Sequence, residues 1–204
     1  MISLLLASTL TFKVLGIDCA KCAPPVTKAL ASVPGVTSVH VDTKAQTATI
    51  EGSPDPAKIH EALENAGFEA ELPGEHRADF APLSAAEIAK LDIAVFNGRA
   101  KVDIDKSLAA GKITIVDFYA DWCGPCTVLE RRLERYMAAH PEIALRRVNI
   151  GKWDNAAARQ ATNLGAAALP YVRVYARDGK FVRAVTGGMW DEVLAAIERS
   201  ANSE

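Results

Sequence analysis

Apolar and polar positions in the first third of the chain switch between the two spacings of regular secondary structure. Apolar residues that alternate with polar ones predict strands, and apolar residues that recur every three or four positions predict helices. The predicted elements run strand, helix, strand, strand, helix, strand, at residues 10–14, 26–33, 39–41, 48–50, 59–66 and 68–72. Gly67 marks the end of the second helix, because glycine readily adopts the left-handed conformation that closes many helices.

This β-α-β-β-α-β order predicts an N-terminal α+β domain of the ferredoxin-like type over residues 9–72. Pro73 and Gly74 open a polar stretch rich in turn formers, which predicts a linker over residues 73–83. Ser84 and Glu87 have the spacing of a capping box, in which two side chains satisfy backbone N–H groups at a helix start. We therefore expect a second domain over residues 84–204, opening with a short helix that ends near residue 91.

Strands and helices alternate through this second part of the chain, as is typical of α/β domains. The predicted strands span residues 93–96, 113–119, 143–150, 171–175 and 181–185. The predicted helices span residues 103–110, a segment from the second Cys-x-x-Cys to about residue 140, and residues 155–163 and 190–197. The strand at 113–119 is expected to be buried on both faces because it is largely apolar. An Asp-Gly pair at 178–179 predicts a hairpin between the last two strands.

Composition and charge narrow the range of partners. Half of the 204 residues are apolar and the formal net charge is −2, so neither nucleic acid nor an anionic membrane surface is expected as a partner. No apolar run approaches the roughly 18 residues of a membrane-spanning helix. Residues 1–10 are mostly apolar but contain no Lys or Arg, so they do not form a complete signal peptide. The chain as written suggests the cytoplasm, and the periplasm if this segment is the remnant of a signal.

The four cysteines form two Cys-x-x-Cys pairs, Cys19/Cys22 and Cys123/Cys126. The second pair follows the buried strand and opens a helix, where backbone N–H groups and the helix dipole stabilise a Cys123 thiolate. Cys126, one turn further on, can resolve the mixed disulfide that Cys123 forms. A structural zinc half-site is the alternative, but its other two ligands would have to be the distant Cys19 and Cys22.

Residues 113–126 read Ile-Thr-Ile-Val-Asp-Phe-Tyr-Ala-Asp-Trp-Cys-Gly-Pro-Cys and resemble the active-site strand and helix start of the thioredoxin family. The resemblance covers about residues 84–200 and implies a three-layer α/β/α fold and thiol-disulfide exchange. It implies that Asp117 accepts the proton of the resolving thiol and that Trp122 covers the nucleophile. Pro170 resembles the family's cis-proline, beside which a substrate chain binds. The other interpretations are a surface carboxylate for Asp117 and simple packing for Trp122.

The first pair lies on a loop between a predicted strand and a predicted helix. Two thiolates on such a loop suit a soft metal such as Cu(I), Zn(II) or Hg(II) and leave the site open for transfer. Residues 16–22, Gly-Ile-Asp-Cys-Ala-Lys-Cys, resemble the metal-binding loop of heavy-metal-associated domains, with Ile17 where that family usually has Met. Phe68 resembles the aromatic residue that packs under this loop. A second redox disulfide at Cys19 and Cys22 is the alternative.

The sequence thus predicts a thiol-disulfide oxidoreductase of the reducing type, with Cys123, Cys126, Asp117, Pro170 and Trp122 in its site and no cofactor for the redox chemistry. The predicted partners are protein disulfides and a thiol electron donor, with a metal-transporting protein as a further candidate. A soft metal is predicted at the N-terminal pair. The alternative function is a non-enzymatic metal carrier that uses its second domain for docking. The fusion also suggests the hypothesis that the second domain keeps the N-terminal pair reduced for metal binding.

Overall fold

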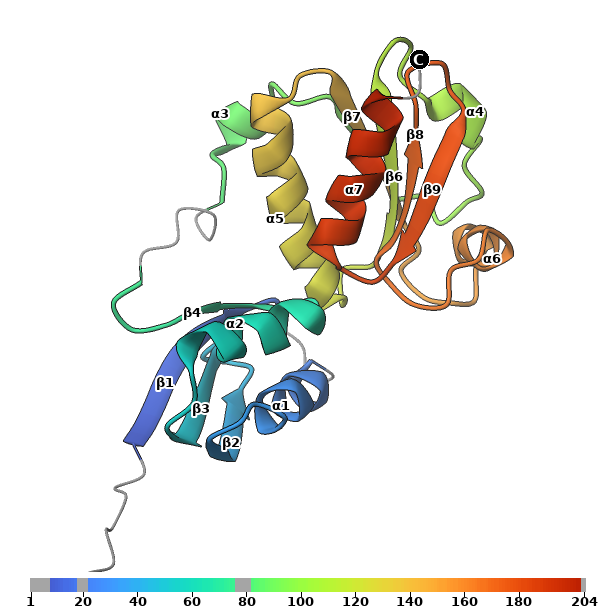
Figure 1. Cartoon of the computed structure of the whole chain (residues 1–204). Coiled ribbons are helices and arrows are strands. Elements are labelled where there is room, and N and C mark those ends of the chain that lie inside the picture. The colour runs from blue at the N-terminus through green and yellow to red at the C-terminus, as the bar shows by residue number, and fades with distance from the viewer. Residues whose placement is uncertain (1–7, 18–21, 76–81, 203–204) are drawn as a thin grey trace, which may run out of the picture.

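The computed structural model describes residues 8–17, 22–75 and 82–202, which form two lobes (Figure 1). The elements of the N-terminal lobe are β1 (Ser8–Leu15), α1 (Ala23–Ala31), β2 (Val36–Asp42), β3 (Thr47–Gly52), α2 (Pro56–Asn65) and β4 (Glu69–Glu71). Its strands pair antiparallel in the order β2-β3-β1-β4. The predicted ferredoxin-like order is therefore confirmed.

One apolar core holds the N-terminal sheet against its two helices. Val26 and Leu30 of α1 pack with Ile59 and Leu63 of α2 and with the inner side chains of the strands. Asp55 begins α2 by accepting a hydrogen bond of 2.9 Å from the backbone N–H of residue 57, which satisfies one of the free donors at the helix start. Both helices therefore lie on one face of the sheet.

The C-terminal lobe contains a mixed five-stranded sheet. Its elements are α3 (Ala85–Ile88), β5 (Ile93–Phe96), α4 (Ile104–Ser107), β6 (Ile113–Tyr119), α5 (Gly124–Ala139), β7 (Ile143–Asn149), α6 (Ala156–Asn163), β8 (Tyr171–Tyr175), β9 (Phe181–Thr186) and α7 (Trp190–Ala201). The strand order is β5-β7-β6-β8-β9. β5, β7 and β6 run parallel, whereas β8 and β9 are antiparallel to their neighbours.

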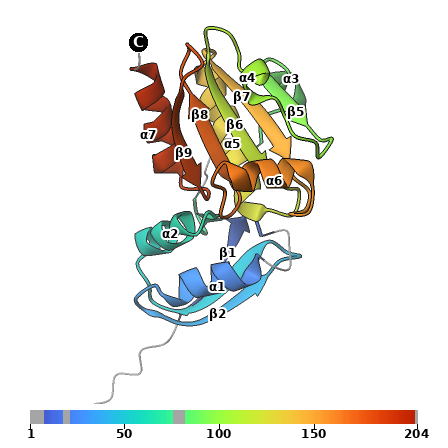
Figure 2. The same cartoon turned by 90° about the vertical axis from the view of Figure 1, so that its right-hand side faces the viewer.

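Helices cover both faces of this sheet, as the two views together show (Figures 1 and 2). α5 and α7 pack on the face that carries Ile113 and Ile115, and α6 packs on the face that carries Val116 and Phe118. All seven residues of β6 are buried, as predicted. Side chains of a strand alternate between faces, so the odd-numbered Asp117 belongs to the face beneath α5 and α7.

Two predicted helices are shorter than expected. The segment that starts at Ser84 has the predicted capping box, but α3 ends at Ile88 and continues only as a turn. α4 covers Ile104–Ser107 instead of residues 103–110. It stops because the N–H of Ala109 bonds to the side-chain oxygen of Thr114, 3.0 Å away, in place of a helical carbonyl. Both predicted ends were wrong, and for α4 the reason is a side-chain bond that the hydrophobic pattern does not encode.

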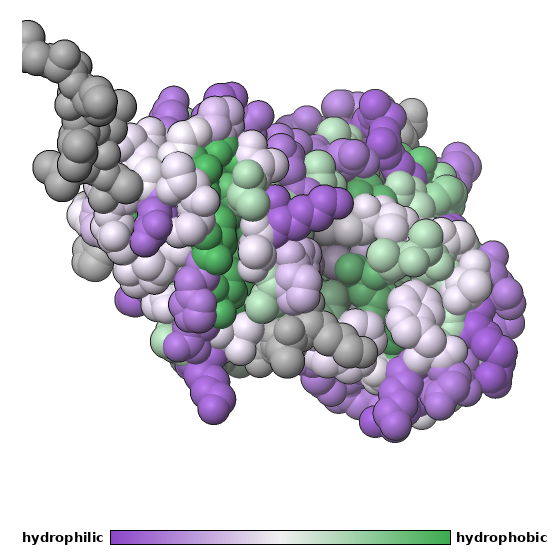
Figure 3. Space-filling model, turned by 90° about the horizontal axis from the view of Figure 1, so that it is seen from below, coloured by the Kyte–Doolittle hydropathy of each residue, from purple (hydrophilic) through white to green (hydrophobic). Residues whose placement is uncertain are grey.

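The exposed surface is mixed in polarity. On the face seen in Figure 3, hydrophilic side chains surround a narrow apolar strip on one lobe and smaller apolar areas on the other. Across the part of the chain that the structure describes, no helix combines the length and the apolar composition that crossing a membrane requires.

Candidate redox site and metal-binding loop

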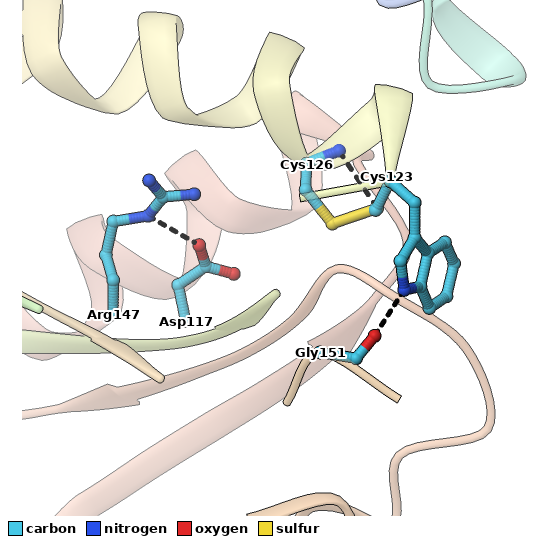
Figure 4. Close-up of a disulfide and its surroundings, with 6 residues drawn as sticks. Asp117, Cys123, Cys126, Arg147 and Gly151 are labelled. Atoms are coloured by element: carbon cyan, nitrogen blue, oxygen red, sulfur yellow. Dashed lines mark hydrogen bonds and ion pairs between the residues drawn. A yellow bond between two sulfur atoms is a disulfide. The ribbon is translucent and has the colours of Figure 1, made fainter. Parts of the chain in front are cut away.

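The loop that joins β6 to α5 is fixed by the end of β7. The side-chain amide of Asn149 donates to both carboxylate oxygens of Asp121, at 3.1 Å each. The indole N–H of Trp122 donates to the carbonyl of Gly151, and the dashed line that ends on Gly151 in Figure 4 marks this bond. The indole is still about half exposed, at 45%. These bonds place Cys123 at the N-cap of α5, just beyond the carboxyl end of β6, the central strand of the sheet.

Cys123 and Cys126 form a disulfide with an S–S distance of 2.04 Å. The Cys123 sulfur accepts a hydrogen bond of 3.2 Å from the backbone N–H of Cys126 and so acts as the N-cap of α5. Backbone donors at a helix start favour negative charge on the capping atom. Cys123 and Cys126 are 5% and 1% exposed. The geometry thus favours a Cys123 thiolate and keeps Cys126 inside the fold.

Asp117 lies fully buried beneath the helix that carries the two cysteines. Burial raises the pKa of this carboxyl to about 6, against the lowering effect of the nearby Arg147 guanidinium. One carboxylate oxygen is 3.2 Å from Nε of Arg147, whereas Oδ1 has no hydrogen-bond partner in the described chain. In Figure 4 the carboxylate points toward the side on which the disulfide lies. A buried carboxyl that titrates near neutral pH is suited to accept and release a proton.

Arg147 is a site residue that the sequence reasoning missed. It faces Asp117 across the β6–β7 pair, contacts Glu130 of α5 through Nη1, and stacks on the ring of Tyr119 with 3.7 Å between Cζ and the ring centroid. The Arg146-Arg147 pair within an otherwise apolar strand was the available signal, because a buried arginine requires a buried acid.

Pro170 and Gly187 form the neighbouring wall. The Leu169–Pro170 peptide is cis, in agreement with the resemblance. The N–H of Gly187 donates to the carbonyl of Pro170 at 2.8 Å. Gly187 has φ of +90°, and a Cβ added there would meet no atom within 4 Å. Open backbone beside a proline leaves room for another polypeptide to approach.

Cys22 is the described member of the N-terminal pair; Cys19 lies outside the described residues. Cys22 is the N-cap residue of α1 and is 4% exposed, in the same core as Ile17 and Phe68. Its sulfur is disulfide-bonded in this structure. Within the described ranges, no group of three or more His, Cys, Asp or Glu side chains could hold a metal. A thiolate at Cys22 would be a soft donor at a helix start, so its chemistry fits a soft ion.

Gly16 and Cys22 of the N-terminal lobe pack against the start of α5. A Cβ added to Gly124, between the two redox cysteines, would lie 1.7 Å from the carbonyl oxygen of Gly16 and 3.0 Å from the Cys22 sulfur. A Cβ added to Gly67 would lie 3.0 Å from Cβ of Pro125. The two Cys-x-x-Cys motifs, about 100 residues apart in sequence, therefore meet in space, which sequence patterns alone did not predict.

A charged contact beside this point links the lobes. Arg132 of α5 lies 3.4 Å from Glu64 of α2 and contacts the buried Glu69 of β4 through Nε. The Arg132 guanidinium also lies 6.0 Å from the centroid of Trp190 on α7. Figures 1 and 2 both show the N-terminal end of α5 directed at the N-terminal lobe. The contact between the lobes thus combines the close approach of their backbones at Gly16 and Gly124 with the Arg132 guanidinium between two carboxylates.

Comparison with known proteins identifies the families that this chain resembles. Residues 98–199, half of the chain, match the family model described as Thioredoxin. The chain belongs to the thioredoxin family. Residues 11–69 match the model of the heavy-metal-associated domain, so the chain carries a heavy-metal-associated domain ahead of its thioredoxin domain. Both predicted resemblances are confirmed.

Each individual relative aligns with only part of this chain. The F-type chloroplastic thioredoxin of Brassica napus is 32% identical over 98 residues, which are 47% of this chain and 52% of the relative. Oxidized MerP from Ralstonia metallidurans CH34 is 27% identical, with a TM-score of 0.32, and spans 33% of this chain and 97% of MerP. Spinach thioredoxin f, short form, is 22% identical, with a TM-score of 0.44, and spans 53% and 93%. The chain spans about half the length of the plant thioredoxins it matches.

Proposed function

We propose that this chain is a thiol-disulfide oxidoreductase of the reducing type, acting on protein disulfides, and that its N-terminal domain binds a soft metal ion. The observation that carries the redox proposal is the Cys123 sulfur at the start of α5, where it accepts the Cys126 N–H above the buried Asp117. The thioredoxin match over residues 98–199 supports it.

The proposed reaction uses five residues of the C-terminal domain. The Cys123 thiolate attacks one sulfur of a substrate disulfide, and the other substrate sulfur leaves as a thiolate. Asp117 takes the proton of Cys126, whose thiolate then attacks the Cys123 sulfur and releases the second substrate thiol. The substrate is reduced and the Cys123–Cys126 disulfide remains, to be reduced by an external dithiol. Pro170 is proposed to position the substrate backbone, and Trp122 to flank the reacting sulfur.

Reduction of insulin by the full-length chain, with dithiothreitol as the electron source, tests the redox proposal. We expect catalytic precipitation of the insulin B chain and a Cys123/Cys126 potential near the value of about −270 mV typical of reducing thioredoxins. A potential near −120 mV, typical of a strong oxidant, would overturn the reducing direction. Stoichiometric metal binding without any turnover would favour the non-enzymatic carrier.

The metal proposal places a soft ion as cargo between the thiolates of Cys19 and Cys22. The family match and the thiolate donors support it, because thiolates select ions such as Cu(I), Zn(II) or Hg(II) over hard cations. We expect one equivalent of Cu(I) to bind to the reduced chain in equilibrium dialysis, and Cys22→Ser to weaken binding at least about tenfold. Unchanged binding by Cys22→Ser, or equal binding by Cys123→Ser and Cys22→Ser, would contradict this site.

A further inference from the structure

The N-terminal domain covers the part of the redox domain from which Cys123 would react. Gly16 and Cys22 lie against Gly124, the residue that follows Cys123. On the other side, Gly67 lies against Pro125, and a Cβ added to Gly188 would lie 3.6 Å from the Gly67 Cα. The covered surface therefore runs from the redox helix toward the Gly187–Gly188 turn.

The same turn is hydrogen-bonded to the cis-proline. Gly187 donates to Pro170 at 2.8 Å, so the turn and the proline form one continuous wall beside the redox pair. In the proposed reaction this wall is where a substrate chain is bound. The N-terminal domain thus reaches the edge of the surface that a protein substrate would need, and its Gly16 and Cys22 lie against the start of the redox helix.

The cysteines at this contact are shielded from water. Cys22, Cys123 and Cys126 are between 1% and 5% exposed. The contact is also oriented, because Arg132 lies between Glu64 and the buried Glu69 and fixes the N-terminal lobe on α5. A shielded and oriented contact raises the effective concentration of one sulfur at another well above that of a flexible tether.

We propose that the N-terminal domain is the redox domain's own substrate, with Cys22 as the sulfur that Cys123 attacks. The inference rests on the proposed disulfide exchange at Cys123. In the first step a Cys123–Cys22 bond forms, the disulfide in which Cys22 takes part breaks, and its other sulfur leaves as a thiolate and takes up a proton. In the second step Cys126 attacks Cys123, and Cys22 leaves as a thiolate. Two electrons pass from the C-terminal pair to the N-terminal pair, which restores thiolates that can bind metal.

A full-length variant with Cys19→Ser and Cys126→Ser tests the contact, because it retains only Cys22 and Cys123. Equilibrated in glutathione buffers, it is expected to form an intramolecular disulfide with an effective concentration at least about tenfold above the millimolar value of a flexible linker. Trypsin cleaves after Lys21, Lys28, Lys112 and Arg131, so mass spectrometry under non-reducing conditions would find peptide 22–28 linked to peptide 113–131. Glutathione adducts or intermolecular dimers in place of this link would overturn the proposal.

Two glycine substitutions in the Cys19→Ser/Cys126→Ser variant distinguish loss of the contact between the domains from local backbone strain. Gly67→Ala introduces a Cβ at φ of +80° and 3.0 Å from Pro125, whereas Gly74→Ala introduces one at φ of +88° with no atom within 4 Å. We expect Gly67→Ala to lower the effective concentration at least about tenfold and Gly74→Ala to leave it unchanged. An equal loss in both variants, or in neither, would contradict a docked substrate.

Insulin reduction by the unsubstituted chain, measured in parallel, distinguishes the two proposals. If insulin is reduced but no Cys22–Cys123 link forms, the internal substrate is refuted and the proposed function stands. If insulin is not reduced and Cys123 does not react with glutathione, the proposed function itself fails.

Discussion

Cys126→Ser is expected to stop the chain after a single substrate disulfide. Cys123 keeps its place at the start of α5 and still attacks, but no second thiol breaks the mixed disulfide. Turnover should therefore fall by about three orders of magnitude or more, while one substrate molecule per chain remains covalently bound. The insulin assay with dithiothreitol would measure turnover, and non-reducing electrophoresis and mass spectrometry of the reduced variant mixed with insulin alone would measure the covalently bound substrate.

Cys123→Ser is the matched comparison and is expected to form no such mixed disulfide. Its remaining thiol, Cys126, is 1% exposed, so a protein substrate cannot reach it. Both variants should be made in a Cys19→Ser/Cys22→Ser background, so that the N-terminal pair cannot capture Cys123. Equal capture of insulin by the two variants would contradict the assignment of Cys123 as nucleophile and Cys126 as resolving thiol.

Asp117→Asn is expected to stabilise the fold above neutral pH and to have little effect in acid. The pKa of Asp117 is raised from 3.8 to about 6, so the folded chain retains this proton after the unfolded chain has released it. The stability that the neutral carboxyl contributes is present below pH 3.8 and is lost as the pH rises through about 6. At about 1.4 kcal/mol per pKa unit, asparagine should raise the free energy of unfolding by up to about 3 kcal/mol at pH 8.

Urea denaturation between pH 4 and pH 8, followed by tryptophan fluorescence, measures this difference, since all three tryptophans belong to the C-terminal domain. The same variant should slow release of the mixed disulfide by about a hundredfold, because Cys126 loses its proton acceptor. Asp154→Asn makes the same chemical change at an exposed site and should alter neither quantity. A stability change in Asp117→Asn that does not vary with pH would refute the titration of this carboxyl.

The order of secondary structure followed from the sequence because periodicity is a local property. The βαββαβ order of the first domain and the alternating elements of the second agree with the structure. The ends of α3 and α4 did not, and for α4 the bond from the Ala109 N–H to the Thr114 side chain decides where the helix stops. The domain boundaries at residues 72–73 and 83–84 stay predictions.

The residues of the proposed C-terminal site could be predicted from the sequence, because Cys123, Cys126 and Asp117 belong to one short segment. Arg147 was missed because it meets Asp117 across two strands that are 30 residues apart. The contact between Gly16 and Gly124 could not be predicted from the sequence pattern at all, because it joins two domains. Nothing in the spacing of one motif encodes which surface of another domain it will contact.

The close approach at Gly124 limits how the redox pair can be varied. In a single-domain protein with this motif, a substitution between the two cysteines would be interpreted from its effect on the reduction potential alone. Here any side chain at position 124 would enter the space held by the Gly16 carbonyl, 1.7 Å from a Cβ. A shift in potential and a displacement of the metal-binding domain would then arise from the same substitution. A residue at position 124 must therefore suit both domains, and glycine does because it carries no Cβ.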